Sequence, residues 1–133
     1  MSKINYEKLL KQNRKIKIAI VGSRDFVDFD LFKEKVDPVF SDLSGHIDCI
    51  VSGGAKGADS LAEQYARDNR INTVIYKPEW KKYGRGAGIV RNRVIIDNSD
   101  LVIAFLKNNS KGTKNSIKVA TELKKELIVF ELD

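Results

Sequence analysis

Short apolar runs alternate along the chain with longer segments whose apolar residues recur every three or four positions. The short runs are rich in Ile, Val and Leu and predict strands, of which the first is expected to be buried. These strands are expected at Ile16–Val21, Ile47–Val51, Asn72–Tyr76, Leu101–Leu106 and Leu127–Leu132. Apolar side chains that recur once per helical turn share one face, so the longer segments predict amphipathic helices. The helices are expected at Leu31–Leu43, around Leu61–Ala66, at Ala87–Asn98, around Ile117–Leu123 and, before the first strand, at Tyr6–Lys15.

Strands that alternate with helices in this way predict an α/β fold. We expect a single Rossmann-like, doubly wound domain, with a mainly parallel, five-stranded sheet and helices on both faces. The nearly continuous apolar strands fit a sheet that is covered on both faces. No linker or repeat divides the chain. We therefore assign residues 1–14 to a polar N-terminal helix or extension and residues 15–133 to the Rossmann-like domain.

Glycine and hydroxyl residues concentrate in segments that each follow a predicted strand. The segments are Gly22–Arg24, Ser52–Asp59, a basic stretch that begins at Lys77, and Ser110–Thr113. Eight of the nine glycines lie in them, and only Gly45 lies elsewhere. The carboxyl ends of parallel strands meet at one edge of a sheet, where doubly wound folds bind ligands. The sequence therefore predicts a binding site at this edge.

The same segments contain the groups that bind phosphate. Glycine lets the backbone approach a ligand closely, and a helix N-terminus presents unpaired N–H groups to an anion. Arg, Lys, Ser and Thr side chains can complete the shell. We therefore expect a phosphate-bearing ligand such as a nucleotide or a nucleotide-sugar. The G-x-G-x-x-G motif of dinucleotide dehydrogenases does not follow the first strand, and Gly57 precedes Ala58 rather than the lysine of a P-loop.

The net charge of +6 over 133 residues is unevenly distributed, which favours a local anion site over a general basic surface. Asp25–Asp48 holds seven acids and two lysines, and Lys77–Arg93 holds six bases and one acid. Lys107–Lys118 holds four lysines and no acid, and Met1–Ile16 holds five bases and one acid. A single cysteine excludes an internal disulfide. Without a long apolar run or a signal-peptide core, we expect a cytoplasmic protein with no membrane partner.

An ordered set of motifs extends from about Lys15 to the C-terminus. It consists of Gly22-Ser23-Arg24-Asp25-Phe26, Ser52-Gly53-Gly54-Ala55-Lys56-Gly57-Ala58-Asp59, Trp80, Ala87-Gly88 with Arg91-Asn92, and Ser110-Lys111-Gly112-Thr113. This set resembles the SLOG superfamily, and most closely its small stand-alone branch of YspA-related proteins. The resemblance implies a Rossmann-like domain that binds nucleotides or NAD-derived molecules such as ADP-ribose species, as a sensor or sequestering module. Relatives often pair, so the resemblance is also consistent with a homodimer.

Two other groups that resemble this chain show where it departs from an enzyme pattern. In the LOG phosphoribohydrolases, an Arg-Lys pair precedes the fourth strand, and here Arg91 matches the Arg while Asn92 replaces the Lys. Ser116 stands where those enzymes have their catalytic Glu, so acid–base chemistry lacks its obvious carboxylate. The Smf/DprA proteins share the Gly-Ser-Arg and Ser-Gly-x-Ala-x-Gly-x-Asp stretches, and they bind single-stranded DNA. We therefore expect binding rather than catalysis.

The predicted ligand-binding residues come from all of these segments. They are Gly22, Ser23, Arg24, Ser52, Gly53, Gly54, Lys56, Gly57, Asp59, Trp80, Arg91, Asn92, Ser110, Lys111, Gly112 and Thr113. Phosphate is expected to be surrounded by Arg24, Gly53, Gly54, Gly57, Ser110, Gly112 and Thr113, and a base or ribose to contact Trp80, Asp59 and Arg91. No Cys/His cluster indicates a metal, and no cofactor is required beyond the nucleotide-type ligand itself.

Each of these residues also has a purely structural interpretation. The glycines could form a tight strand–helix turn, Asp59 could be a favourable first-turn carboxylate, and Trp80 could cap the core. Thr113 could cap a helix. Two other functions stay open. One is a nucleotide N-glycosidase or phosphoribohydrolase that uses Asp59 and Arg91. The other is single-stranded DNA binding through the basic stretch Lys77–Arg93.

Overall fold

The computed structural model describes residues 4–132 and has a five-stranded, all-parallel sheet in the order β3-β2-β1-β4-β5. The first three residues of the predicted N-terminal extension and the last residue of the predicted domain lie outside this range. The strands are β1 (Ile16–Gly22), β2 (Ile47–Ser52), β3 (Asn72–Ile75), β4 (Leu101–Lys107) and β5 (Glu126–Leu132). The α/β class, the strand count and the parallel arrangement predicted from the sequence are confirmed.

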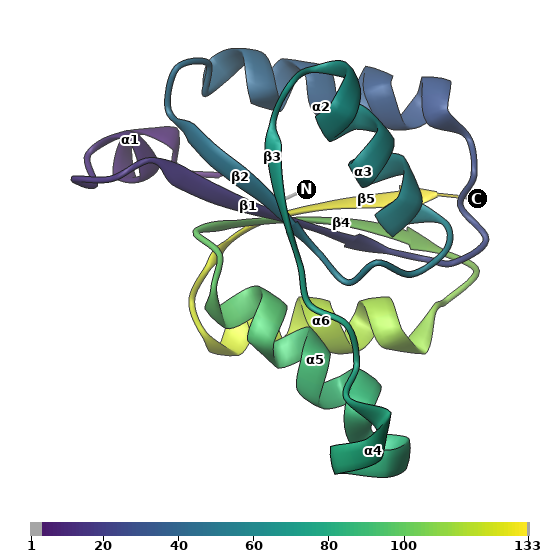
Figure 1. Ribbon diagram of the computed structural model, residues 1–133. Helices are drawn as coiled ribbons and strands as arrows, with labels where there is room; N and C mark the ends of the chain where they lie inside the picture. Colours follow the sequence, from purple (N-terminus) through teal and green to yellow (C-terminus); the bar gives the residue numbers. More distant parts are fainter. Residues whose placement is uncertain (1–3, 133) are drawn as a thin grey trace.

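Helices cover both faces of the sheet (Figure 1). They are α1 (Tyr6–Leu10), α2 (Phe29–Asp42), α3 (Ala58–Asp68), α4 (Trp80–Tyr83), the 3₁₀ turn η1 (Gly84–Gly86), α5 (Ala87–Asp97) and α6 (Lys111–Glu122). In the view of Figure 1, α2 and α3 lie above the sheet and α5 and α6 below it, while α4 extends away from the sheet at the bottom. The protein is therefore a three-layer α/β domain with a Rossmann-like arrangement.

Alternate strand residues supply two separate cores. Ile18 and Ile20 of β1 pack toward the layer of α2 and α3, where Phe32 and Tyr65 are buried. Ala19 and Val21 point to the other face and pack with residues of α5 and α6. Because consecutive side chains of a strand point to opposite faces, a strand covered on both sides reads as a continuous apolar run. This geometry explains why the central strands could be recognised from the sequence.

The N-terminal segment departs from its prediction. The helix expected at Tyr6–Lys15 ends at Leu10, so the predicted C-terminal half of this helix is wrong. Leu9 is the only residue of α1 that is buried, and the polar residues that follow it have no apolar face to pack.

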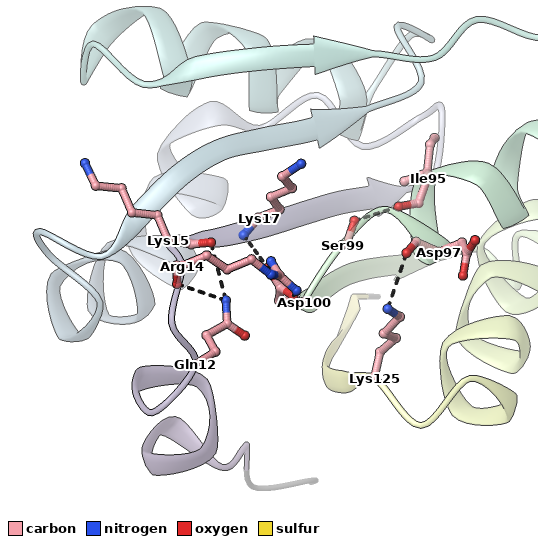
Figure 2. A network of polar contacts seen from close by, with 9 residues as sticks. All are labelled: Gln12, Arg14, Lys15, Lys17, Ile95, Asp97, Ser99, Asp100 and Lys125. Atoms are coloured by element: carbon pink, nitrogen blue, oxygen red, sulfur yellow. Dashed lines mark hydrogen bonds and ion pairs between the residues drawn. The ribbon is translucent and has the colours of Figure 1, made fainter.

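Polar contacts instead fix this segment to the start of β4 (Figure 2). Arg14 makes a bidentate ion pair with Asp100, with N–O distances of 2.8 and 2.6 Å. The backbone N–H of Lys17 donates to the same carboxylate at 2.8 Å, and Gln12 donates to the carbonyl of Arg14 at 3.2 Å. The turn before β1 is therefore held by side chains rather than by helical hydrogen bonds.

The basic stretch that begins at Lys77, for which the sequence predicted no helix before Ala87, contains regular structure. It contains the short helix α4 and the turn η1, which lead directly into α5.

Among residues 4–132, no helix combines the length and the apolar character needed to cross a membrane.

Candidate functional site

The strand order reverses between β1 and β4, which are neighbours in the sheet although they are far apart in the sequence. From their carboxyl ends the chain turns to opposite faces, with α2 on one side and α6 on the other (Figure 1). Such a switch point leaves a crevice outside the strand ends. Here a cavity of about 480 Å³ opens, which we call the switch-point cavity. It is lined by the ends of β1 and β4, by Ala55 before α3 and Asp59 in its first turn, by α4 and η1, by one side of α5 and by the N-terminal half of α6.

The structure brings ten of the sixteen predicted residues together around this cavity. They are Gly22, Ser23, Arg24, Asp59, Trp80, Arg91, Asn92, Ser110, Gly112 and Thr113. The remaining six do not line it: Ser52, Gly53, Gly54, Lys56, Gly57 and Lys111. Sequence reasoning missed several lining residues, including Asp25, Arg85, Ile89, Lys107, Asn108 and Ser116. Only Asp25 directly adjoins a predicted residue. Lys107 and Asn108 lie at the end of β4, and this position was the signal that could have found them.

Ser23 joins the two strands that meet at the switch point. Its hydroxyl donates to the carbonyl oxygen of Lys107 at 2.9 Å and accepts from the backbone N–H of Lys107 at 2.8 Å. The side chain is almost completely buried, with 1% of its surface exposed. Ser23 therefore extends the β1–β4 pairing beyond the last strand residue. The adjacent Arg24 is exposed and lines the cavity, so its charge is available to a ligand.

A tight turn carries the chain from β4 to α6. Asn108 and Asn109 both have positive φ, of 52° and 55°, and the N–H of Ser110 donates back to the carbonyl of Lys107 at 3.2 Å. Asn tolerates this left-handed conformation better than most residues. The Asn108 amide also donates to the carboxylate of Asp25, which links the loops after β1 and β4. This turn sets the direction in which the chain continues into α6, so that the N-terminus of α6 lies beside the cavity.

The N-terminus of α6 faces the cavity. Ser110, rather than Thr113, is the N-cap: its hydroxyl accepts from the N–H of Thr113 at 3.3 Å. The Thr113 hydroxyl donates to the Ser110 oxygen at 2.9 Å and is buried. Gly112 lies in the first turn of the helix, and a Cβ atom there would meet no heavy atom within 4 Å. The helix therefore presents its positive end beside open space, an arrangement that favours an anion.

The three glycines of the segment after β2 do not line the cavity, unlike Gly22 and Gly112. Gly57 has a φ of 75°, and a Cβ atom there would overlap the carbonyl oxygens of Ser23 and Arg24. The first N–H of α3, from Ala58, donates to the Ser23 carbonyl at 3.2 Å. The start of α3 is therefore packed against the loop after β1, which accounts for this glycine by close backbone contact.

Arg91 and Asp59 form the inner wall of the cavity. Arg91 Nη1 donates to the Gly53 carbonyl at 2.9 Å, and its Nε donates to the Asn92 Oδ1 at 3.2 Å. Asp59 is 7% exposed, and its Oδ2 accepts from the N–H of Ala55 at 3.1 Å. Burial raises the pKa of Asp59, although the Ala55 N–H and the nearby Arg91 charge oppose this rise. Burial likewise lowers the pKa of Arg91, and the Asp59 charge counteracts it.

An exposed aromatic surface borders the cavity. Trp80 is 56% exposed and Tyr83 is 40% exposed, one turn apart on α4, and the nearby Ile89 of α5 is 63% exposed. Trp80 lines the cavity and lies outside the core clusters, so it does not serve as a core cap. Within the described part of the chain, no group of three or more His, Cys, Asp or Glu side chains is arranged to hold a metal ion.

Fold and site together define a small Rossmann-like α/β protein with a cationic cavity at its topological switch point. The chain belongs to the YspA, cpYpsA-related SLOG family, whose sequence model matches residues 16–83. It is also similar to the Gene 61 protein of Mycobacterium phage D29, with 29% identity over 111 residues that cover 78% of this chain and 87% of that protein.

Two solved structures share the fold. DNA processing protein A from Helicobacter pylori has a TM-score of 0.66 and 23% identity, over 95% of this chain and 69% of that chain. That structure was described for its single-stranded DNA binding mode. DNA processing protein A (DprA) from Streptococcus pneumoniae has a TM-score of 0.67 and 26% identity, over 86% of this chain and 50% of that chain. The chain thus spans half the length of the Streptococcus pneumoniae protein.

Proposed function

We propose that the chain binds a phosphate-bearing, nucleotide-derived ligand in the switch-point cavity, and that it acts as a sensing or sequestering module in the cytoplasm. One observation carries the proposal: four cationic side chains, Arg24, Arg85, Arg91 and Lys107, line the same cavity as the N-terminus of α6. Only two acidic side chains, Asp25 and Asp59, line it with them. Convergent cations and a helix N-terminus favour an anion, and phosphate in particular.

The shape of the cavity supports a ligand larger than a free phosphate. Its volume of about 480 Å³ is in the range of small-molecule sites. The cationic groups share the cavity with an apolar wall of Val21, Ile89 and Ile95 and with the indole of Trp80. A nucleotide has this combination of an anionic group and a flat apolar ring, which can stack on an exposed indole.

A thermal-shift assay with AMP, NAD and ADP-ribose tests this proposal. A bound ligand at 100 times its Kd should stabilise the protein by about 2.7 kcal/mol. Arg24→Ala should weaken binding by about tenfold or more, because a charge-assisted hydrogen bond is lost. Arg67→Ala is the matched control, since Arg67 is exposed near the end of α3 and does not line the cavity.

The proposal is contradicted if no compound stabilises the protein, or if Arg24→Ala binds as tightly as the parent. Chromatography of the same mixtures for released base tests the N-glycosidase alternative. Base release that Asp59→Asn abolishes would assign hydrolysis to this site. The homodimer suggested by the resemblance stays a prediction, which sedimentation equilibrium would test.

Single-stranded DNA is the second candidate ligand, and the surface of α4 favours it. The exposed Trp80 and Tyr83 lie among Lys77, Lys81 and Lys82, all of them exposed. Aromatic side chains beside cations suit the stacked bases and phosphates of a single strand. The fold shared with DNA processing protein A from Helicobacter pylori adds to this argument.

Anisotropy of a labelled oligo-dT at several salt concentrations tests this candidate. Binding should weaken with salt, with a slope of about −0.7 per phosphate contacted. Trp80→Ala should weaken it by about 1–3 kcal/mol through lost stacking. Leu10→Ala, which removes an exposed apolar side chain at the end of α1, should leave the affinity unchanged. An oligonucleotide that binds equally well to the parent and to Trp80→Ala would argue against the α4 surface.

A further inference from the structure

The backbone φ of Gly53 does not explain why this position is a glycine. Gly54 and Gly57 have positive φ values of 71° and 75°, which favour glycine, but Gly53 does not have a positive φ. Its φ therefore does not require glycine. The need for glycine at position 53 must therefore come from the space around it.

Arg91 occupies that space. A Cβ atom at position 53 would lie 2.5 Å from Arg91 Nη1 and 2.8 Å from Arg91 Cζ, both well inside contact distance. It would also lie 3.0 Å from Asp59 Oδ2. The Gly53 carbonyl accepts from Arg91 Nη1 at 2.9 Å, and the more distant Tyr76 carbonyl lies 3.5 Å from the same atom. The guanidinium thus rests directly on the glycine backbone.

These contacts orient the guanidinium toward the cavity. Its hydrogen bonds to Gly53, Tyr76 and Asn92 use Nη1 and Nε, and none of them uses Nη2. Arg91 lines the switch-point cavity, whereas Gly53 does not. A planar guanidinium fixed on one side keeps its remaining N–H groups for an anion on the other.

We propose that Gly53 and Asp59 form a seat for Arg91, and that Arg91, rather than the Gly53 backbone, contacts the ligand from this side of the cavity. Gly53 is a positioning residue because it leaves room for the guanidinium, and Asp59 supplies the neighbouring negative charge. The part about the ligand rests on the proposed function, whereas the seat itself is a property of the protein alone.

A double-mutant cycle between Gly53→Ala and Arg91→Ala tests the proposal. In calorimetric titrations with AMP and ADP-ribose, each single variant should weaken binding by about tenfold or more. In the Arg91→Ala background, adding Gly53→Ala should change the Kd by less than about twofold, because the displaced group is already gone. Additive losses would overturn the proposal, since they would mean that Gly53 contacts the ligand independently of Arg91.

Unfolding without ligand separates the seat from the proposed function. Gly53→Ala should lower the Tm of the parent modestly, because the end of the Arg91 side chain must move and leave the Gly53 carbonyl. It should lower that of Arg91→Ala less, because truncation of Arg91 removes the two shortest contacts. Gly86→Ala is the control: a Cβ atom there meets nothing within 4 Å, so its effect should be the same in both backgrounds.

Each outcome of the unfolding experiment decides the question of the seat. If Gly53→Ala folds only together with Arg91→Ala, the rescue supports the seat. If Gly53→Ala is equally harmful in both backgrounds, or if neither folds, the clash lies elsewhere and the seat is refuted. If the cycle shows the rescue but AMP and ADP-ribose do not bind the parent, the seat stands and the proposed function falls.

Discussion

Gly57 and Gly45 share a left-handed backbone but have different surroundings. Their φ values are 75° and 83°. A Cβ atom at position 57 would overlap the carbonyl oxygens of Ser23 and Arg24, whereas one at position 45 would meet nothing within 4 Å. The pair therefore separates the effect of backbone strain from that of close packing.

We expect Gly57→Ala to lower the free energy of unfolding by at least about 2 kcal/mol more than Gly45→Ala does, because overpacking adds to a similar backbone strain. Urea denaturation of the two variants measures the difference. Equal losses would show that the loop after β1 can move away from α3 without penalty.

The buried Asp59 carboxylate makes a prediction about pH. Burial raises the pKa of Asp59 above its ordinary value of 3.8. The stabilisation that comes from binding a proton there is fully present below pH 3.8 and is lost as the pH rises through the folded-state pKa. The parent should therefore gain stability relative to Asp59→Asn as the pH is lowered from neutrality. Denaturant unfolding across this range checks the direction, and a constant difference between the two proteins would contradict it.

At the residue scale, the sequence predicted that the glycines lie at the carboxyl edge of the sheet. It did not predict the contacts that explain why each position is a glycine. Gly22 and Gly112 do line the cavity, while Gly53 lies behind Arg91. Arg91 is 38 residues away in the sequence from the carbonyl it binds. No local pattern indicates which distant side chain fills the space left by a missing Cβ atom, so this information exists only in the folded structure.

At the scale of elements, the pairing of β1 with β4 determines the geometry of the site. Both strands end at the cavity, and the Ser23 hydroxyl satisfies both backbone groups of Lys107 beyond the regular ladder. This contact joins the backbone of the segments that carry Arg24 and Lys107, the two side chains that we assign to the ligand.

Ser23→Ala should lower the free energy of unfolding by about 1–3 kcal/mol, because the part-buried N–H of Lys107 loses the hydroxyl oxygen to which it donates. It should also weaken ligand binding, through disorder of the loop after β4. Chemical denaturation and the thermal-shift assay measure the two effects. A stable Ser23→Ala variant would show that the hydroxyl contact is dispensable.

The variant Ser110→Ala, which removes the N-cap of α6, should lose about 1 kcal/mol of stability.

Asp100 holds the N-terminal segment to the start of β4, and the pH dependence of this contact is opposite to that of the buried Asp59. Burial would raise the pKa of Asp100, but hydrogen bonds from Arg14 and from the Lys17 N–H outweigh it, so the pKa lies below 3.8. The stabilisation that the ionised Asp100 carboxylate provides is therefore present above pH 3.8. It is lost as the pH falls through the lower pKa that Asp100 has in the folded protein.

Asp100→Asn should accordingly lower the free energy of unfolding by about 1–2 kcal/mol near neutral pH, since the Arg14 side of the pair is exposed and screened. The difference from the parent should shrink in acid, where the parent loses the same contact. Denaturation at neutral and acidic pH measures both values. A loss that persists unchanged in acid would assign the effect to packing instead.

Element boundaries were predicted well where packing dictates them and poorly where polar contacts do. The five strands and helices α2, α3, α5 and α6 follow apolar periodicity, and each was recognised from the sequence. Helix α1 ends early because Arg14 makes a tertiary contact with Asp100 and Gln12 holds the turn that follows the helix. Helix α4 has no buried residue, so periodicity could not identify it.

At the scale of the whole molecule, the uneven charge noted in the sequence acquires a spatial meaning. The acid-rich segment after β1 folds mainly into α2, on the face of the sheet opposite to α5 and α6 (Figure 1). Two of the three basic segments, Lys77–Arg93 and Lys107–Lys118, contain residues of α4, α5 and α6 that line the cavity. Anions should therefore be attracted to one side of the molecule, with a dependence on ionic strength.

The most direct test of the central claim is an amide NMR titration with ADP-ribose and AMP. Our account predicts saturable shifts of the Arg24, Gly112 and Thr113 amides, and their loss in Arg24→Ala. The account would be contradicted by the absence of saturable shifts with either compound. It would equally be contradicted by shifts confined to the separate cavity of about 530 Å³ that Asp37, Tyr65 and Asn69 help to line.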